Sequence, residues 1–217
     1  MKKLLYDIKA HDFHGNLHGI FKNNLENFSC FEDLHKIKSY EVMDIYNDQD
    51  TIFHKIYYDN YEIKIREIYE NFIKTEVVKL FKEDIVYQQV PTFRAHLCNN
   101  FAVSEFHKDS DFFHSKEEIN FFLPLTCAKG NNTVWVESKK GLEDFSPMNA
   151  SYGEYIMWDG ANLKHGNMKN DTGKSRVSID FRIIPMSLYV ENNSYSISNN
   201  TKFTIGDYFK FIKWENK

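Results

Sequence analysis

The chain has 217 residues, of which 42% are hydrophobic and 16% aromatic, so it can form a substantial core and is not a disordered polymer. Its formal net charge is −4 and its basic residues are dispersed, which argues against nucleic acid as a partner. It has no apolar stretch long enough for a membrane span, no apolar signal segment at its start, and no cysteine pairs of the zinc or disulfide kind. We therefore expect a cytoplasmic protein with no membrane partner, folded as a single domain over residues 1–217.

The first 84 residues have the spacing of helices. From about residue 61 to 82, apolar residues recur at intervals of three to five positions with Lys and Glu between them, which predicts an amphipathic helix. One or two shorter helices are expected within residues 17–45. We expect the whole segment 1–84 to act as a helical buttress for the remainder of the domain.

After residue 84 the pattern changes to short apolar stretches separated by clusters of Gly, Asn, Asp and Pro. The predicted strands are 85–89, 92–98, 102–107, 118–125, 132–138, 154–158, 163–168 and 175–184. Such a series is typical of a β-sandwich, jelly roll or barrel. Together with the helices it predicts a mainly β, α+β fold with a core over residues 85–185. Residues 186–217 form an aromatic extension that we expect at the mouth of the barrel.

The segment EFHKDSDFFH, residues 105–114, contains a His-x-Asp pair formed by His107 and Asp109. On a strand these two side chains point to the same face and can reach one metal ion, whereas His114 has the opposite parity. A third ligand must come from elsewhere, and His165 in LKHGN is the candidate. Two histidines and one carboxylate form the facial triad of non-haem Fe(II) oxygenases, which leaves coordination positions open.

An arginine and a serine follow on the last predicted strand. Arg176 and Ser178 share one face of this strand, and Val177, Ile179 and Phe181 occupy the other. A planar guanidinium is suited to bind a buried carboxylate, such as the far end of 2-oxoglutarate. Arg182 lies on the same face as Arg176 and is a rival for this role. We prefer Arg176, which follows His165 by eleven residues.

These motifs, in this order and spacing, resemble those of the Fe(II)/2-oxoglutarate-dependent dioxygenases. The sequence around these motifs is similar to that of the branch that contains phytanoyl-CoA hydroxylase-like proteins and the streptomycin-biosynthesis StrG-like proteins. The segments that carry the resemblance are EFHKDSD, EINFFLPLT, NNTVWVES, YGEYIMWDG, LKHGN and SRVSIDFRIIP, within residues 91–185. The resemblance implies a double-stranded β-helix (a cupin-like jelly roll) that holds iron between its two sheets. It also implies that His107, Asp109 and His165 bind the iron and that Arg176 and Ser178 bind 2-oxoglutarate.

Weaker candidates lie on neighbouring predicted strands. Arg94 and His96 share a face of the strand before the His-x-Asp pair, a strand that related enzymes often use to contact cosubstrate or substrate. We expect His96 and Asn120 near the cosubstrate, and Arg94, Arg182 and Trp135 near the substrate. Asp109 itself is informative, because related halogenases have a small residue in its place; its presence favours hydroxylation.

A second histidine cluster, His11, His14 and His18, has helical spacing that would suit zinc. Gly15 and Gly19 weaken a helix at this point, and the glutamate of an HExxH motif is absent. A loop or substrate-lid role is the preferred interpretation.

The sequence therefore predicts an enzyme that uses Fe(II), 2-oxoglutarate and O2 to hydroxylate a small polar metabolite, such as a sugar, amino acid or natural-product intermediate. Arg94 and Arg182 would suit an anionic substrate. The alternative is a cupin-like protein that binds a ligand without catalysis, or a cupin isomerase. Either alternative would leave Arg176 without a cosubstrate to hold.

Overall fold

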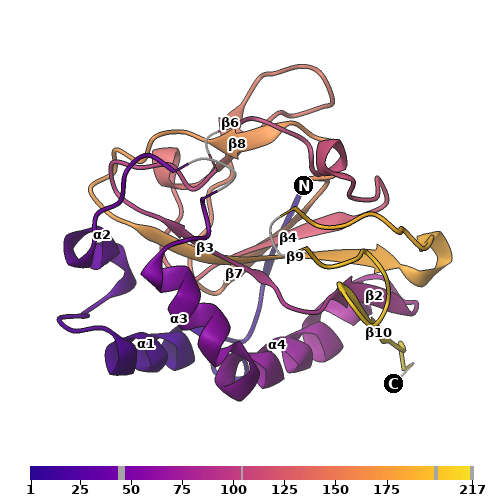
Figure 1. Ribbon diagram of the computed structural model, residues 1–217. Coiled ribbons are helices and arrows are strands. Elements are labelled where there is room, and N and C mark those ends of the chain that lie inside the picture. Colours follow the sequence, from indigo (N-terminus) through magenta and orange to yellow (C-terminus); the bar gives the residue numbers. More distant parts are fainter. Residues whose placement is uncertain (44–46, 104, 198–199, 216–217) are drawn as a thin grey trace.

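The computed structural model describes residues 1–43, 47–103, 105–197 and 200–215. Figure 1 shows three layers: a row of helices, a long sheet above it and a small sheet on top. The prediction of N-terminal helices combined with a mainly β remainder is confirmed, since helices precede residue 84 and most strands follow it.

The helical layer contains α1 (Phe13–Asn24), α2 (Leu34–Ile37), α3 (Ile52–Asn60) and α4 (Arg66–Phe72). Two polar side chains fix the helix starts. The Asp12 carboxylate accepts the Gly15 N–H of α1, and the Thr51 hydroxyl accepts the His54 N–H of α3. Part of the predicted helical stretch 17–45 lies outside the described residues, because these stop at Met43.

The helix expected over 61–82 is the second half of a longer helical run that begins at Ile52. Two π-helical turns, Tyr61–Ile65 and Ile73–Val77, interrupt the α-helical geometry on either side of α4. A π-turn accommodates one additional residue. This explains why the five-residue interval from Phe72 to Val77 still leaves both side chains buried.

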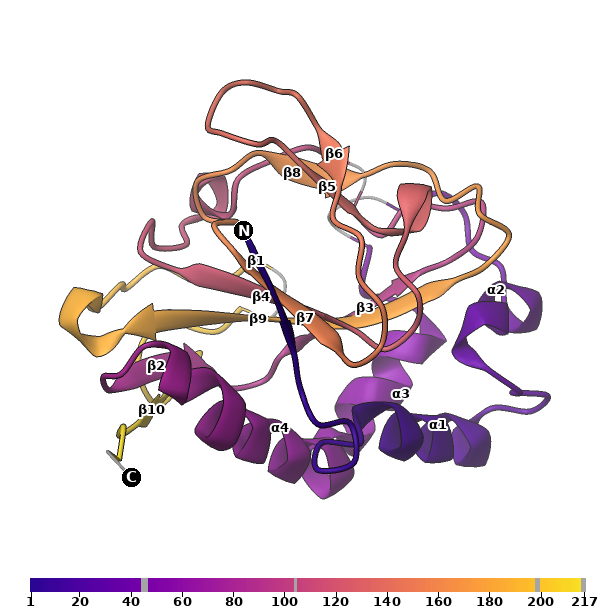
Figure 2. The ribbon, with the colours of Figure 1, turned by 180° about the vertical axis from the view of Figure 1, so that it is seen from behind.

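The long sheet has seven strands, and every pairing within it is antiparallel. Its order is β1 (Lys2–Leu5), β7 (Glu154–Trp158), β4 (Ile119–Pro124), β9 (Arg176–Pro185), β2 (Ile85–Gln88) and β10 (Phe209–Ile212), and β3 (Thr92–His96) also pairs with β9. The small sheet has the order β6 (Ser146–Pro147), β5 (Val134–Val136) and β8 (His165–Asn167). Figure 2 shows it facing the long sheet from the side opposite the helices.

Seven of the eight predicted strands are present, but the strand expected over 102–107 is not formed by its described residues, which exclude residue 104. Only His107 pairs, through an isolated antiparallel bridge to His165. The segment instead leads into a 3-10 helix over Asp109–Phe112. The sequence pattern did not reveal β1, β6 or β10, which are all short.

Strand β9 separates two environments. Its apolar side chains, Val177, Ile179, Phe181 and Ile183, belong to a core shared with the helices. That core includes Phe72 of α4 and Phe93 of β3. A second, smaller core lies between the sheets and includes Phe122, Val136 and Ile156. The helices therefore support one face of the long sheet and leave the other face to the small sheet.

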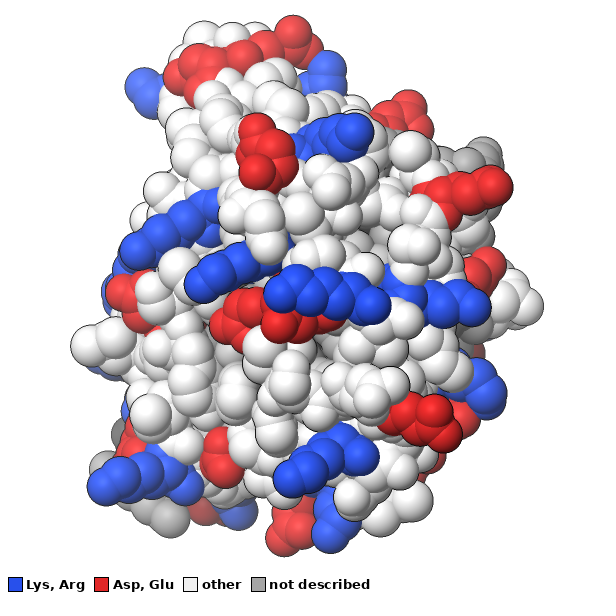
Figure 3. All heavy atoms as spheres, turned by 90° about the vertical axis from the view of Figure 1, so that its left-hand side faces the viewer, with Lys and Arg blue, Asp and Glu red and all other residues white. Residues whose placement is uncertain are grey.

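Charged groups of both signs cover the face that lies to the left in Figure 1. Figure 3 shows Lys and Arg side chains interspersed with Asp and Glu side chains there. Among the described residues, no helix combines the length and apolarity that a bilayer crossing requires.

Candidate metal centre

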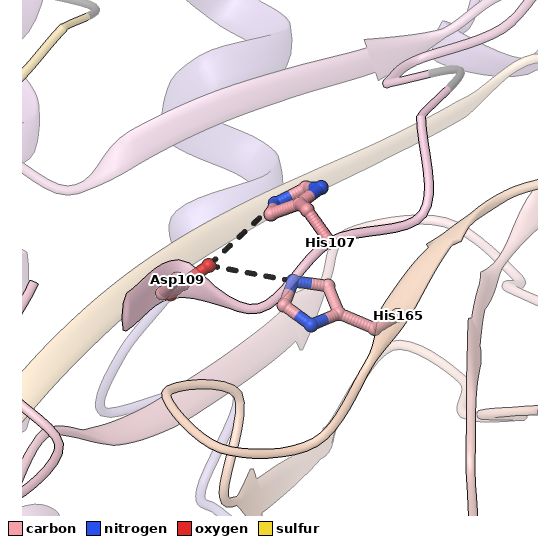
Figure 4. A group of neighbouring side chains, drawn as sticks. All are labelled: His107, Asp109 and His165. Carbon is pink, nitrogen blue, oxygen red and sulfur yellow. Dashed lines mark ion pairs between the residues drawn. The ribbon is translucent and has the colours of Figure 1, made fainter. Parts of the chain in front are cut away.

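Three side chains from two distant segments converge between the sheets (Figure 4). One ligand atom from each of His107, Asp109 and His165 lies within 4.8 Å of the others. The carboxylate Oδ1 of Asp109 is 3.7 Å from Nε2 of His107 and 3.4 Å from Nε2 of His165. In the described part of the chain, no other group of three His, Cys, Asp or Glu side chains meets this criterion.

The backbone brings the two histidines together. The His107 N–H donates to the His165 carbonyl at 2.9 Å, and the His165 N–H donates to the His107 carbonyl at 2.8 Å. Asp109 is oriented by a turn, since it opens the 3-10 helix and its N–H donates to the Gly160 carbonyl at 3.1 Å. The prediction that these residues meet is confirmed. The strand parity used to explain it was wrong, because Asp109 does not lie on a strand.

The protonation of both imidazoles suits a metal ion. Nδ1 of His107 lies 2.8 Å from the Glu105 carbonyl, and Nδ1 of His165 lies 2.9 Å from the Leu163 carbonyl. Carbonyl oxygens only accept hydrogen bonds, so each Nδ1 carries a proton, and the neutral form of each ring presents its lone pair on Nε2. Two lone pairs and a carboxylate oxygen then face one another, which is the donor set that a divalent cation requires.

The second oxygen of Asp109 is fully engaged. Its Oδ2 accepts hydrogen bonds from Asn120 Nδ2 at 2.7 Å and from Arg182 Nε at 2.8 Å, and Arg182 Nη2 lies 2.8 Å away. Burial opposes the charge of Asp109, but the adjacent Arg182 guanidinium outweighs it and holds the pKa of this carboxyl well below its ordinary value. Asp109 is therefore ionised before any metal binds.

Arg176 is almost completely buried, at 1% exposure. Its hydrogen-bond partners are neutral: Nε donates to the Asn132 carbonyl at 2.9 Å and Nη1 donates to the Ser178 hydroxyl at 2.6 Å. The guanidinium also lies over the Phe122 ring, 5.6 Å from its centroid. Burial lowers the pKa of Arg176 to about 10, so it remains charged at neutral pH. A buried cation with neutral partners can accommodate an incoming carboxylate.

The two other arginines differ from Arg176, because carboxylates already surround them. Arg94 forms an ion pair with Asp48 and lies 3.7 Å from Asp180. Arg182 pairs with Asp109 and approaches Glu118 at 3.5 Å. Neither guanidinium is therefore available to an anion in the way that Arg176 is.

The remaining predicted residues occupy different positions. His96 is buried beside Arg176 in the β3–β9 register, with its ring nitrogens near the Asn132 and Asn100 carbonyls. Trp135 donates its indole N–H to the Gly130 carbonyl and lies outside the cavities described below. His114, which parity set aside, pairs with Glu118 at 2.8 Å.

The metal candidates open into a cavity with about 570 Å³ of empty space. The cavity is lined by the three metal candidates and also by Arg176, Trp158 and Asn120. Trp158 stands edge-on to the His165 ring, with 4.7 Å between centroids. The two sites that the sequence predicts separately therefore line one space.

A second, more open cavity with about 580 Å³ of empty space adjoins the first and is called the outer cavity below; the two share Arg94, Val103, His107, Asp109 and Arg182. Its other walls come from three further segments; of these, the sequence predicts the C-terminal extension at the mouth of the barrel but gives no sign of the N-terminal one. The N-terminal segment contributes Asp48 and Gln49, the segment after Asp109 contributes Phe112 and His114, and the C-terminal extension contributes Ser196 and Ile197. No sequence motif identifies these wall residues, because only the tertiary fold brings their segments together.

The histidine cluster near the N-terminus is largely part of α1, contrary to the loop interpretation. His14 and His18 stack with 6.0 Å between ring centroids, and His18 Nε2 lies 3.0 Å from the Ser29 carbonyl. The Asp12 cap compensates for the weak helix propensity of Gly15, since its carboxylate accepts the Gly15 N–H at 2.8 Å.

Solved structures share this architecture at low sequence identity. The non-heme monooxygenase ThoJ in complex with nickel matches with a TM-score of 0.54 and 9% identity, over 90% of this chain and 77% of that one. The non-heme alpha-ketoglutarate dependent carbocyclase SnoK from nogalamycin biosynthesis matches with a TM-score of 0.51 and 8% identity, over 97% and 89% of the chains. CytC3 with Fe(II) and alpha-ketoglutarate matches with a TM-score of 0.50 and 11% identity, over 91% of this chain and 80% of that one. The fold of this chain is therefore similar to the folds of these non-heme enzymes.

No protein-family model matches the sequence. A curated relative does match: the streptomycin biosynthesis protein StrG of Streptomyces griseus is 44% identical over 168 residues, which are 76% of this chain and 78% of that protein. The chain therefore belongs to the StrG family.

Proposed function

We propose that this protein is an Fe(II)- and 2-oxoglutarate-dependent dioxygenase that hydroxylates a small polar metabolite. The observation that carries the proposal is that His107, Asp109 and His165 share one cavity with a buried Arg176, whose hydrogen bonds among the described residues go to neutral groups and not to a carboxylate. A metal site alone would also suit a cupin isomerase or a binding protein. The additional buried cation favours a second ligand with a carboxylate, and 2-oxoglutarate has one at its far end.

In this proposal the three metal candidates hold Fe(II), and Arg176 with Ser178 holds the distal carboxylate of 2-oxoglutarate. The bound iron and cosubstrate supply the oxidising chemistry, in which O2 is consumed and 2-oxoglutarate yields succinate and CO2. The protein fixes the three donor atoms and keeps the site enclosed. Phe122 and Trp158, which line the cavity, reduce the access of water to the reacting groups.

The scaffold we propose is a double-stranded β-helix within a single domain. The outer cavity supports the single domain, because its wall combines Asp48 from the helical segment, Arg94 from the core and Ile197 from the C-terminal extension. Each of the three segments would thus contribute to one substrate site.

The outer cavity is the proposed substrate site, and its charges favour a neutral, hydroxylated substrate over an anionic one. The positive charges of Arg94 and Arg182 are balanced by Asp48, Asp180 and Asp109. An anion would have to displace one of these buried partners, which is costly. Phe112 and Ile197 add apolar surface, which suits the carbon face of a ring.

The reaction class is tested with Fe(II) and 2-oxoglutarate in the absence of oxygen. We expect the weak visible charge-transfer band of the iron–2-oxoglutarate chelate, and slow succinate production after O2 is admitted. The Asp109→Ala variant should show neither signal. A wild-type protein that gives no band and no succinate would refute the oxygenase proposal and leave the binding-protein and isomerase alternatives.

The substrate class is tested with three sugars that share a ring and differ in charge: D-glucose, D-glucosamine and D-glucuronate. Binding to the protein loaded with Zn(II) and 2-oxoglutarate is followed by saturation-transfer NMR. We expect D-glucuronate to give the weakest signal. If D-glucuronate binds most strongly, the proposed substrate class is wrong, while the oxygenase proposal is judged separately by the chelate band.

A further inference from the structure

The carboxylate of Asp109 is held asymmetrically. Its Oδ1 faces the two histidine Nε2 atoms at 3.7 and 3.4 Å, whereas three N–H donors surround Oδ2. Two of these donors belong to one side chain, Arg182, and the third belongs to Asn120. An oxygen that already accepts two hydrogen bonds and has a second guanidinium nitrogen 2.8 Å away is poorly available to a metal ion.

Arg182 is itself fixed from the other side. Its Nη1 lies 3.3 Å from Gln88 Oε1 and 3.2 Å from the Tyr208 hydroxyl, and its Nε lies 3.5 Å from Glu118. Gln88 is on β2, and Tyr208 directly precedes β10 in the C-terminal extension. The guanidinium therefore cannot follow the carboxylate if Asp109 rotates.

We infer that Arg182 is a positioning residue that restrains Oδ2 of Asp109, so that this carboxylate offers a metal only one oxygen. The inference rests on the proposed function, since it requires that Asp109 bind the metal. Carboxylates bind metals through one or both oxygens. If both oxygens of Asp109 bound, one of the positions that 2-oxoglutarate and O2 need would be occupied. Arg182 thus preserves an open position without itself binding the metal.

The Arg182→Met variant separates this role from simple structural support. Without the guanidinium, Oδ2 keeps one donor and is free to turn toward the metal. We expect Mn(II) to bind as tightly as in the wild type or more tightly, because a nearby positive charge is lost and a ligand atom is gained. We expect 2-oxoglutarate to bind more weakly, by on the order of tenfold, because it competes with the second oxygen.

The number of open positions is measured directly by the paramagnetic relaxation of water protons around bound Mn(II). We expect the relaxation enhancement per bound ion to fall by about one third in Arg182→Met, as one of three water positions is filled. Arg182→Lys keeps the positive charge but lacks the planar guanidinium, so its relaxation enhancement should lie between those of the wild type and Arg182→Met. Arg66→Met is the matched control, because Arg66 pairs with Glu62 on the helix surface and should change nothing.

The outcomes distinguish the two proposals. If wild-type protein does not bind Mn(II) at all, the proposed metal site fails and this inference fails with it. If wild-type binding is normal but both Arg182 variants lose Mn(II) and 2-oxoglutarate affinity together, with unchanged water relaxation per bound ion, Arg182 is only structural and the inference alone is overturned. Tighter or equal Mn(II) binding with weaker 2-oxoglutarate binding supports it.

Discussion

The two faces of strand β9 have opposite chemistry. Toward the helices it presents Val177, Ile179, Phe181 and Ile183, all at most 1% exposed. Its other face carries a row of polar and charged groups, Arg176, Ser178, Asp180 and Arg182, of which all but Ser178 line the cavity. One stretch of ten residues thus supplies the centre of the hydrophobic core and one wall of the candidate site.

This alternation assigns stability and function to different side chains. Apolar burial on the helix side is the favourable contribution to folding. Buried charges on the cavity side contribute little to stability and are better explained by ligand binding. The comparison therefore predicts that mutations on the two faces have separable effects, and the following experiments test that separation.

The largest expected effect is that of Asp109→Ala on the cavity side. The two histidine Nε2 atoms would lose the negative charge between them, so we expect metal binding to be lost and succinate production to fall by on the order of 10³ or more. Bound Fe(II) per chain and the rate of succinate release measure this. Asp59→Ala is the control, because Asp59 pairs with Lys55 on the exposed surface of α3. Full metal binding by Asp109→Ala would disprove the assignment.

On the helix side the strongest test is Phe181→Ala. Phe181 stacks on Phe121 with 4.9 Å between ring centroids and stands edge-on to Tyr69 at 5.3 Å. Loss of this ring should lower the free energy of unfolding by about 3–5 kcal/mol, as measured in urea. Phe211→Ala, at an exposed position of β10, should have a much smaller effect. The separation of the two faces fails if folded Phe181→Ala protein no longer binds metal.

Arg176→Gln should act in the reverse way. Because Arg176 has neutral partners, its removal leaves no carboxylate unpaired, and we expect little change in the free energy of unfolding. The affinity for 2-oxoglutarate should fall by roughly 30- to 100-fold while metal affinity is kept. Calorimetric titration of 2-oxoglutarate into the Zn(II)-loaded protein measures the first affinity, and titration of Zn(II) into the metal-free protein measures the second. An unchanged 2-oxoglutarate affinity would mean that another residue binds its distal carboxylate. The surface variant Arg66→Gln controls for the loss of one positive charge.

Much of this arrangement is readable from the sequence, because strand periodicity fixes which side chains share a face. Parity on β9 correctly separated Phe181 from Arg176, and the same reasoning on β3 separated Phe93 from Arg94. These segments lie in the long sheet, where pairing of β3 with β9 and of β9 with its other neighbours enforces an extended backbone.

Parity failed where the backbone turns. Asp109 reaches the histidines through a 3-10 helix, whose start is fixed by the distant Gly160 carbonyl. The ion pair between Asp48 and Arg94 likewise joins segments that no local pattern connects. Such contacts depend on the tertiary fold, and periodicity describes only a single element. The prediction of a single domain stays a prediction.

The smallest expected effect concerns a histidine on the helix side. His54 of α3 is 1% exposed, its Nδ1 lies 2.7 Å from the Thr51 hydroxyl, and its Nε2 has no hydrogen-bond partner among the described residues. Burial, assisted by the positive charge of Arg94, lowers the pKa of His54 to about 3. The unfolded chain takes up this proton near the ordinary pKa of about 6.5, whereas the folded protein does not. Stability that is present above pH 6.5 is therefore lost progressively as the pH falls toward 3.

In a His54→Phe variant this contribution disappears. Between pH 7 and pH 5.5 the variant should lose about 1 kcal/mol less unfolding free energy than the wild type. Urea unfolding at the two pH values measures the difference. Between pH 7.5 and pH 8.5 the two proteins should respond alike, because the imidazole is mostly neutral in both folded and unfolded chains. Equal acid sensitivity of the variant and the wild type would mean that His54 is protonated in the folded protein. The apolar side of the sheet would then contain a buried positive charge, which its packing is expected to exclude.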